Sequence, residues 1–163
     1  MTEPTTRRSG ERRFSPELAD PSRGPTASQA AGMTLKTATT LMKAAKAAAR
    51  ERSVAISVAV VDQGGQLVAF ERMDGADLVT IRLAQDKAWT ALVNRMPTRD
   101  LGPLVQPGAD FYGYASIGGG RTITFAGGMP VELEGVLVGG VGVSGGSVEQ
   151  DQEIVDGALA ALG

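Results

Sequence analysis

Residues 53–72 read SVAISVAVVDQGGQLVAFER, and this stretch decides the fold of the chain. Up to Val61 the side chains alternate in size, with one large set (Val54, Ile56, Val58, Val60) and one small set (Ala55, Ser57, Ala59). Such alternation predicts a central strand with one bulky face and one face of small residues. The sequence DQGG at residues 62–65 is typical of a turn, and residues 66–72 return as a second strand. Together these features predict a β-hairpin.

Three segments around the hairpin have the apolar spacing of helices. The first has Thr34 as its N-cap, and its predicted buried stripe is Leu35, Ala38, Met42, Ala45 and Ala49. The second covers residues 77–94 and ends before Pro97, with a predicted stripe of Leu78, Ile81, Ala84, Ala88 and Leu92. The third follows Ser147 and Gln150, which have the spacing of a capping box.

The glycine-rich second half of the chain predicts the rest of the sheet. Residues 122–126 and 135–144 have strand character, and the long irregular stretch 98–121 is expected to hide one short strand or helix at 111–117. Three glycines in the later strand remove side chains from both of its faces, so a helix or a ligand must pack closely there (Gly139, Gly140, Gly142). Because hairpins join the strands, we expect an α/β (α+β) fold with a mainly antiparallel sheet of about five strands flanked by helices.

The first 32 residues differ from the rest of the chain. Pro, Ser, Thr, Arg and Glu dominate them, and their apolar residues have no period. Such a stretch cannot bury enough surface to offset the entropy of ordering it, so we expect a flexible tail at 1–32 before one domain at 33–163. No apolar run follows the arginine pairs at residues 7–8 and 12–13, which argues against an export signal and favours a cytoplasmic protein.

Composition excludes several classes of partner and of chemistry. The 163 residues carry a net charge of −2, so the chain lacks the excess of positive charge that is typical of nucleic-acid-binding proteins. No apolar run approaches the length of a membrane span. The chain has neither cysteine nor histidine, so disulfides, thiolate sites and imidazole ligands are excluded. Chemistry would have to come from other polar side chains, from backbone amides or from a cofactor.

Four stretches of the chain together carry a family resemblance. They are AVVDQGGQLVAFERMDGA (59–76), DKAWTA (86–91), FAGGMPV (125–131) and GVLVGGVGVSGGSVEQDQEIVDGAL (135–159). In this order they resemble the GlcG/HbpS-like haem-binding family, which also includes the C-terminal domain of PduO-type proteins. The resemblance covers about residues 33–163.

The resemblance implies a profilin-like α/β fold, a homo-oligomer, and binding of haem, corrinoids or other small molecules. Family members often carry a histidine at the position of Gln66, whereas this chain has no histidine. An axial ligand for haem iron would then be limited to Tyr112, Tyr114, a methionine such as Met73, or a lysine. No other metal site is expected.

Several loop residues are candidates for a catalytic site. Arg72 and Asp74 follow the hairpin and could grip a carboxylate or polarise a carbonyl, while Tyr112 and Tyr114 in the long segment could transfer protons. The alternative is that Asp74 or Asp77 caps the second helix and that Arg72 pairs with a neighbouring acid.

Two glycine-rich turns are candidates for binding a cofactor or an anion. Gly118, Gly119 and Gly120 with Arg121 could present backbone amides and a guanidinium group, or form a simple hinge. Ser144, Gly145 and Gly146 precede the capped third helix, whose N-terminus could bind an anion.

Lys87 on the second helix is expected to be solvated, because lysine is rarely buried unpaired.

Three functions are compatible with the sequence. The first is a binding protein for haem, another tetrapyrrole or a different small molecule. The alternative is a cofactor-independent isomerase, cyclase or dehydratase acting on a small carbonyl compound. The third is a structural oligomer packed through the glycine-rich strand.

Overall fold

A computed structural model describes residues 32–163 of the protein. The predicted flexible tail, residues 1–32, lies outside the described residues except for Gly32, which is buried. The helices are α2 (Leu35–Glu51), α3 (Val79–Asn94), α4 (Thr98–Leu104), the 3-10 helix η2 (Tyr114–Ser116) and α5 (Val148–Ala160). The strands are β1 (Ser57–Asp62), β2 (Leu67–Arg72), β3 (Gly128–Leu133) and β4 (Val136–Ser144).

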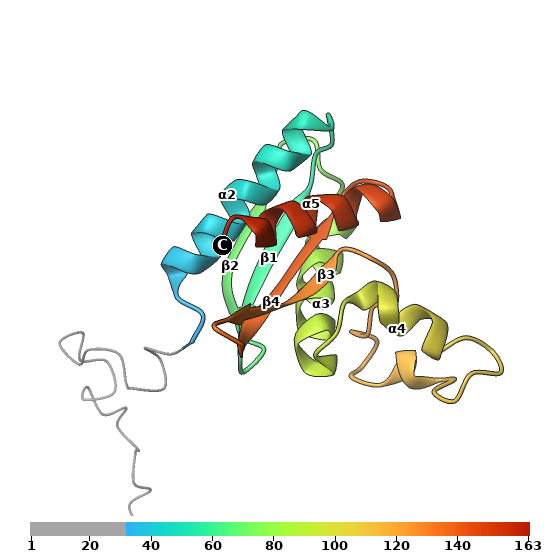
Figure 1. Ribbon diagram of the computed structural model, residues 1–163. Coiled ribbons are helices and arrows are strands. Elements are labelled where there is room, and N and C mark those ends of the chain that lie inside the picture. Colours follow the sequence, from blue (N-terminus) through green and yellow to red (C-terminus); the bar gives the residue numbers. More distant parts are fainter. Residues whose placement is uncertain (1–31) are drawn as a thin grey trace, which may run out of the picture.

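The strands form one antiparallel sheet in the order β2-β1-β4-β3. Helices α2 and α5 cover one face and α3 covers the other, while residues 98–121 project beside α3 as an arm (Figure 1). This confirms the predicted fold class, with four strands rather than about five. Among residues 32–163, no helix has both the length and the hydropathy that a membrane crossing needs.

The predicted hairpin is the β1–β2 pair. The Asp62 carboxylate closes its turn by accepting hydrogen bonds from the backbone N–H groups of Gly64 and Gln66, at 2.9 and 3.0 Å. The bulky face of β1 packs into the core with α2 and α5, and its small face lies against α3. The alternation read from the sequence therefore assigns each face of β1 to its layer correctly.

Helix α3 lies with its backbone directly on strand β4. A Cβ added at Gly142 or Gly140 would overlap the carbonyl oxygen of Ala84 or Ala88, respectively. Both alanines are fully buried, in a small apolar cluster with Ala59, Val61 and Leu92. The close packing predicted for this glycine-rich strand is thus made by a helix and not by a ligand.

One of the predicted strands is wrong. Residues 122–126 have no strand pairing, and the edge strand β3 begins at Gly128 instead. Pro130 made this segment resemble a connection, but a proline that cannot donate a hydrogen bond is tolerated in an edge strand. The short element expected within residues 111–117, either a strand or a helix, is the 3-10 helix η2. The stretch 98–121, predicted as irregular, begins with α4, which the sequence concealed because Gly102 and Pro103 lie inside it.

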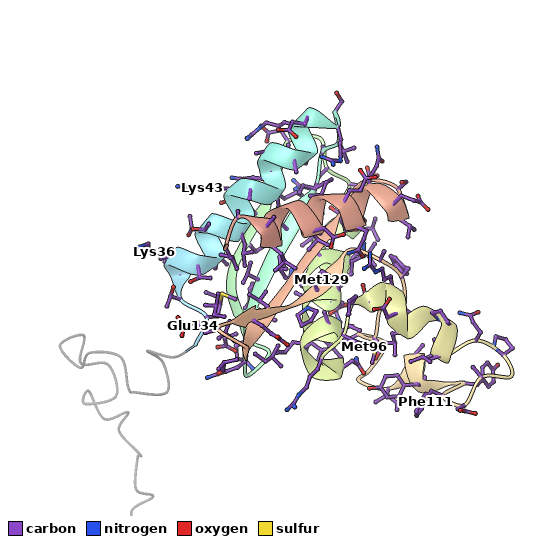
Figure 2. The ribbon with its side chains drawn as sticks, viewed as in Figure 1. Lys36, Lys43, Met96, Phe111, Met129 and Glu134 are labelled. Atoms are coloured by element: carbon purple, nitrogen blue, oxygen red, sulfur yellow. The ribbon has the colours of Figure 1, made fainter. Side chains whose placement is uncertain are left out.

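The predicted helix starts at Thr34 and at Ser147 are confirmed. Thr34 accepts a hydrogen bond from the backbone N–H of Thr37, and Ser147 forms a capping box with Gln150. The stripes of α2 and α3 are buried as predicted except at three residues. Leu35 and Leu78, the first of each stripe, are 64% and 73% exposed, and Ile81 is half-buried. On the outer side of α2, lysines such as Lys36 and Lys43 extend away from the sheet (Figure 2).

Candidate functional site

Lys87 is the most unexpected residue of the structure, because its side chain is fully buried. Its ammonium group donates hydrogen bonds to the Asp151 carboxylate at 2.7 Å and to the Val143 carbonyl at 2.9 Å. It also lies 4.9 Å from the centre of the Phe125 ring. The prediction of a solvated lysine is therefore wrong, because a single acid from α5 compensates the buried charge.

Burial lowers the pKa of the Lys87 ammonium below its ordinary value of 10.5, although the charge and hydrogen bond of Asp151 oppose the shift. The other oxygen of Asp151 accepts a hydrogen bond from the backbone N–H of Gly146 at 2.9 Å. The pair thus ties α3 to α5 across the edge of the sheet. Its groups satisfy one another, which is typical of a structural ion pair.

Arg72 and Asp74 lie together at the end of β2, as the sequence predicted. They line a hollow of about 310 Å³ between this end of the sheet and α2, which we call the basic hollow (Lys46, Arg50, Glu71, Arg72, Met73, Asp74). Helix α3 begins at Val79 with no side-chain cap, so neither Asp74 nor Asp77 caps it as the alternative prediction held. Arg72 has no ion pair within residues 32–163.

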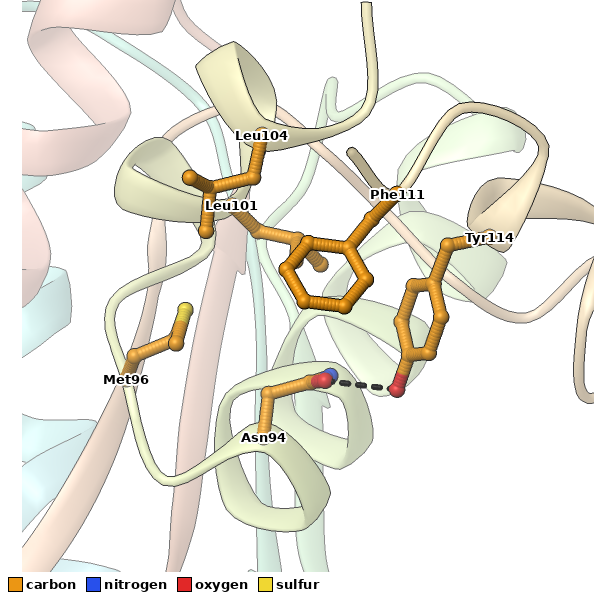
Figure 3. A pocket seen from close by; sticks show the side chains of 6 residues that line it. All are labelled: Asn94, Met96, Leu101, Leu104, Phe111 and Tyr114. Carbon is orange, nitrogen blue, oxygen red and sulfur yellow. Dashed lines mark hydrogen bonds between the residues drawn. The ribbon is translucent and has the colours of Figure 1, made fainter. Parts of the chain in front are cut away.

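Tyr114 lies at the other end of α3, in a separate cavity. This cavity of about 220 Å³, which we call the α4 pocket, has walls from the end of α3, from α4 and from the arm (Asn94, Met96, Leu101, Leu104, Phe111, Tyr114). The Tyr114 hydroxyl donates a hydrogen bond to the Asn94 side-chain oxygen at 2.7 Å, which places one polar group at the mouth of an otherwise apolar space (Figure 3). Tyr112 lies on the arm and is 69% exposed.

The four predicted catalytic residues therefore do not form one site. Arg72 and Asp74 precede the first turn of α3, whereas Tyr114 contacts its last turn. A helix of 16 residues is about 24 Å long at 1.5 Å per residue, so these groups are too far apart to act on one small substrate.

The glycines at 118–120 carry the arm back to α3. Gly118 lies against the Trp89 indole, where an added Cβ would be 3.0 Å from the ring, and Gly119 and Gly120 have positive φ angles. Arg121 lies over the same indole at 4.6 Å and donates a hydrogen bond to the buried Asp86 carboxylate at 3.0 Å. The guanidinium group predicted to bind an anion is thus already paired within the chain, and the segment anchors the arm.

The turn at Ser144, Gly145 and Gly146 is also occupied by the chain itself. Ser144 is buried at the end of β4, and a Cβ at Gly145 would overlap the carbonyl oxygen of Ala55. The Gly146 N–H is bound to Asp151, and the capping box uses the amides that follow. Binding of a cofactor at this turn or at residues 118–121 stays a prediction, and the contacts made there are structural.

Sequence reasoning missed most of the α4 pocket and half of the basic hollow. Leu101 and Leu104 come from a helix that was not predicted, so their common orientation had no signal in the sequence. For Lys46 and Arg50 the sequence did contain a signal, because residues four apart lie on the same side of a helix. Only the fold, however, places that side of α2 beside the end of β2.

Truncation of Trp89 to alanine is expected to loosen the arm more than the rest of the protein. The variant loses the surface on which Gly118 and Arg121 rest, while the two apolar clusters of the core keep their members. We expect amide hydrogen exchange of residues 114–121 to become faster, with a loss of about 1–2 kcal/mol in global stability. Equal acceleration in β1 and β4 would contradict a local anchoring role.

Comparison with known proteins agrees with this architecture. The family model described as "Haem degrading protein HbpS-like" matches residues 33–160. The chain is 44% identical over 122 residues to the corrinoid adenosyltransferase PduO of Citrobacter freundii, a match that covers 75% of this chain but only 36% of PduO. The shared part is thus about a third of that relative's length.

Two solved structures are similar over nearly their full lengths. The protein ORFY of Klebsiella pneumoniae has a TM-score of 0.78 and 38% identity, covering 79% of this chain and 89% of its own. PduOC, solved as a complex with haem, has a TM-score of 0.77 and 41% identity, covering 80% of this chain and 94% of its own. Fold, motifs and sequence identity agree, and the chain belongs to the HbpS-like family.

Proposed function

We propose that this chain is a small-molecule-binding protein whose ligand places an apolar group in the α4 pocket. The observation that carries the proposal is the composition of this cavity, where Met96, Leu101, Leu104 and Phe111 enclose an apolar space. The hydrogen-bonded pair of Tyr114 and Asn94 at its edge can orient one polar atom of the ligand. Apolar walls with few placed polar groups are typical of small-molecule sites.

The residues of the α4 pocket do not fit an iron-ligated haem. Its possible iron ligands are the Met96 thioether and the Tyr114 hydroxyl, and this hydroxyl donates a hydrogen bond to the side-chain oxygen of Asn94. In the part of the chain that the structure describes, no arginine or lysine lines the pocket to stabilise a phenolate or to pair with the haem carboxylates. The volume of about 220 Å³ is also below the roughly 300–1,000 Å³ of pockets for drug-sized ligands. The expected ligand is therefore smaller, with a single ring or a short aliphatic chain.

Titration with p-cresol tests the proposal, because this probe combines one ring with one hydroxyl group. We expect saturable chemical-shift changes at the Met96 methyl group and the Leu104 methyl groups of the full chain. A Leu104→Trp substitution fills the pocket and should weaken binding at least about tenfold, since each buried apolar group contributes on the order of 1 kcal/mol or more. The matched control is Leu67→Trp, which enlarges a leucine of similar exposure on β2 (50% against 40% for Leu104) and should leave binding unchanged.

Haemin is the second probe in this experiment. We expect the absorption spectrum of haemin to stay that of the free compound when the protein is added. A Soret band that shifts with the wild-type chain but not with Leu104→Trp, or equal p-cresol binding in wild type and Leu104→Trp, would overturn the proposal of a small ligand in the α4 pocket.

We also propose that the chain self-associates, as the family resemblance implies. Four exposed large apolar side chains lie within the arm, where a second copy of the chain could cover them (Leu104, Phe111, Tyr112, Ile117). Light scattering of the full chain should then report a mass above 16.8 kDa. The cytoplasmic location stays a prediction.

A further inference from the structure

We propose that the basic hollow is a second binding site, and that it takes a small molecule carrying both an oxyanion and a hydrogen-bond donor such as a hydroxyl group. The site lies at the opposite end of α3 from the α4 pocket and is independent of it. Two separate elements, α2 and β2, supply its cations.

Residues 32–163 do not neutralise the positive charge of the hollow. Lys46 forms an ion pair with Glu71, which leaves the guanidinium groups of Arg50 and Arg72 and the carboxylate of Asp74. Within residues 32–163, neither guanidinium group has an ion-pair or hydrogen-bond partner. Two unpaired guanidinium groups lining one concave surface are suited to an anion, because each can donate two parallel hydrogen bonds to a phosphate or carboxylate group.

Asp74 narrows the class of ligand. A carboxylate next to the anion site repels a bare anion, but it accepts a hydrogen bond from a donor on the same ligand. Met73, which is half-buried, adds an apolar surface between the charged groups for a short carbon skeleton. The lining therefore selects a hydroxylated phosphate ester or hydroxylated carboxylate over the simple ions.

Other charges on α2 do not belong to the site. Lys36 and Lys43 lie on the exposed side of the same helix but do not line the hollow (Figure 2). Lys36 therefore offers a matched control, since its replacement removes one positive charge from α2 and leaves the hollow intact.

The test measures binding of three probes to the full chain by NMR at constant ionic strength: inorganic phosphate, glycerol 3-phosphate and glycerate. Glycerol 3-phosphate and glycerate share a hydroxylated skeleton and differ in the anion, so the tighter one identifies the oxyanion. We expect saturable shifts at the Arg50 and Arg72 side chains. An Arg72→Gln substitution should weaken binding of all three probes at least about tenfold, whereas Lys36→Gln should not.

Replacement of Asp74 should change the preference of the hollow between the probes. In Asp74→Ala, inorganic phosphate should bind more tightly because a repulsive charge is gone, and glycerol 3-phosphate should bind more weakly relative to phosphate because its hydroxyl group has lost an acceptor. Arg72 and Asp74 are exposed, so these variants should keep the melting temperature of the wild type. Shifts that match those caused by sodium chloride, or an equal loss in Lys36→Gln, would overturn the site. Weaker phosphate binding in Asp74→Ala would overturn the proposed role of Asp74.

Discussion

Replacing Gly142 with alanine is expected to lower the free energy of unfolding by more than about 3 kcal/mol, the upper end of the cost of overpacking a core. The new methyl group would overlap the carbonyl oxygen of Ala84 and crowd the backbone nitrogen of Ala88, and both atoms belong to the backbone of α3. A flexible side chain could rotate away from a new methyl group, but a helix backbone can only move as a unit. The helix would therefore have to lift off the sheet and open the apolar cluster beneath it.

Gly157→Ala is the matched control for this substitution, and urea denaturation is the measurement. Gly157 lies in α5, and an added Cβ would be 3.8 Å from its nearest neighbour, the Cβ of Ala48, which is ordinary van der Waals contact. Alanine should stabilise this helix by about 0.5–1 kcal/mol. The same chemical change is thus expected to have opposite signs at the two positions. A Gly142→Ala variant within 1 kcal/mol of wild type would show that α3 is not seated on the strand.

Replacing Lys87 with methionine is expected to cost about 3–5 kcal/mol, although the new side chain is apolar and of similar length. The loss comes from Asp151, which stays buried with its charge and keeps only the Gly146 N–H as a donor. Adding Asp151→Asn to the variant removes this uncompensated charge and keeps an oxygen for Gly146. The double variant should therefore be more stable than Lys87→Met alone.

An exposed ion pair provides the comparison for this effect. Arg52 and Glu153 also join α5 to another helix, with 3.0 Å between Nε and the carboxylate oxygen, but their side chains are 32% and 61% exposed. Arg52→Gln should cost no more than about 1 kcal/mol, because exposed pairs are solvated and screened. Equal costs for Arg52→Gln and Lys87→Met would mean that burial does not set the strength of the Lys87 pair.

The parts of the fold that follow from local pattern were predictable. Alternation in β1, the DQGG turn and the capping box at Ser147 each depend on residues close in sequence, and the structure has all three. Strand β3 was not predictable in the same way, because Pro130 is tolerated only at a sheet edge and the edge exists only after the sheet has formed.

The candidate sites depend even more on distant contacts. Lys87 has no neighbour in sequence that explains its burial, since its partner Asp151 lies on another helix, 64 residues further along the chain. The basic hollow likewise needs α2 and the end of β2 together, and the α4 pocket needs the arm to fold back on α3. Sequence pattern identified Arg72, Asp74 and Tyr114 as polar groups in loops but could not say that the structure divides them between two cavities.

Because α3 meets β4 through its backbone, its larger side chains are not needed to fill that contact. On one flank Asp86 and Trp89 hold the arm, and on another Lys87 reaches α5. Exchange of residues 106–117 for a segment of different length, with α4 and Arg121 kept, would therefore leave the helix packed on its sheet. In such a scaffold the choice of ligand can be re-engineered separately from the ability to fold.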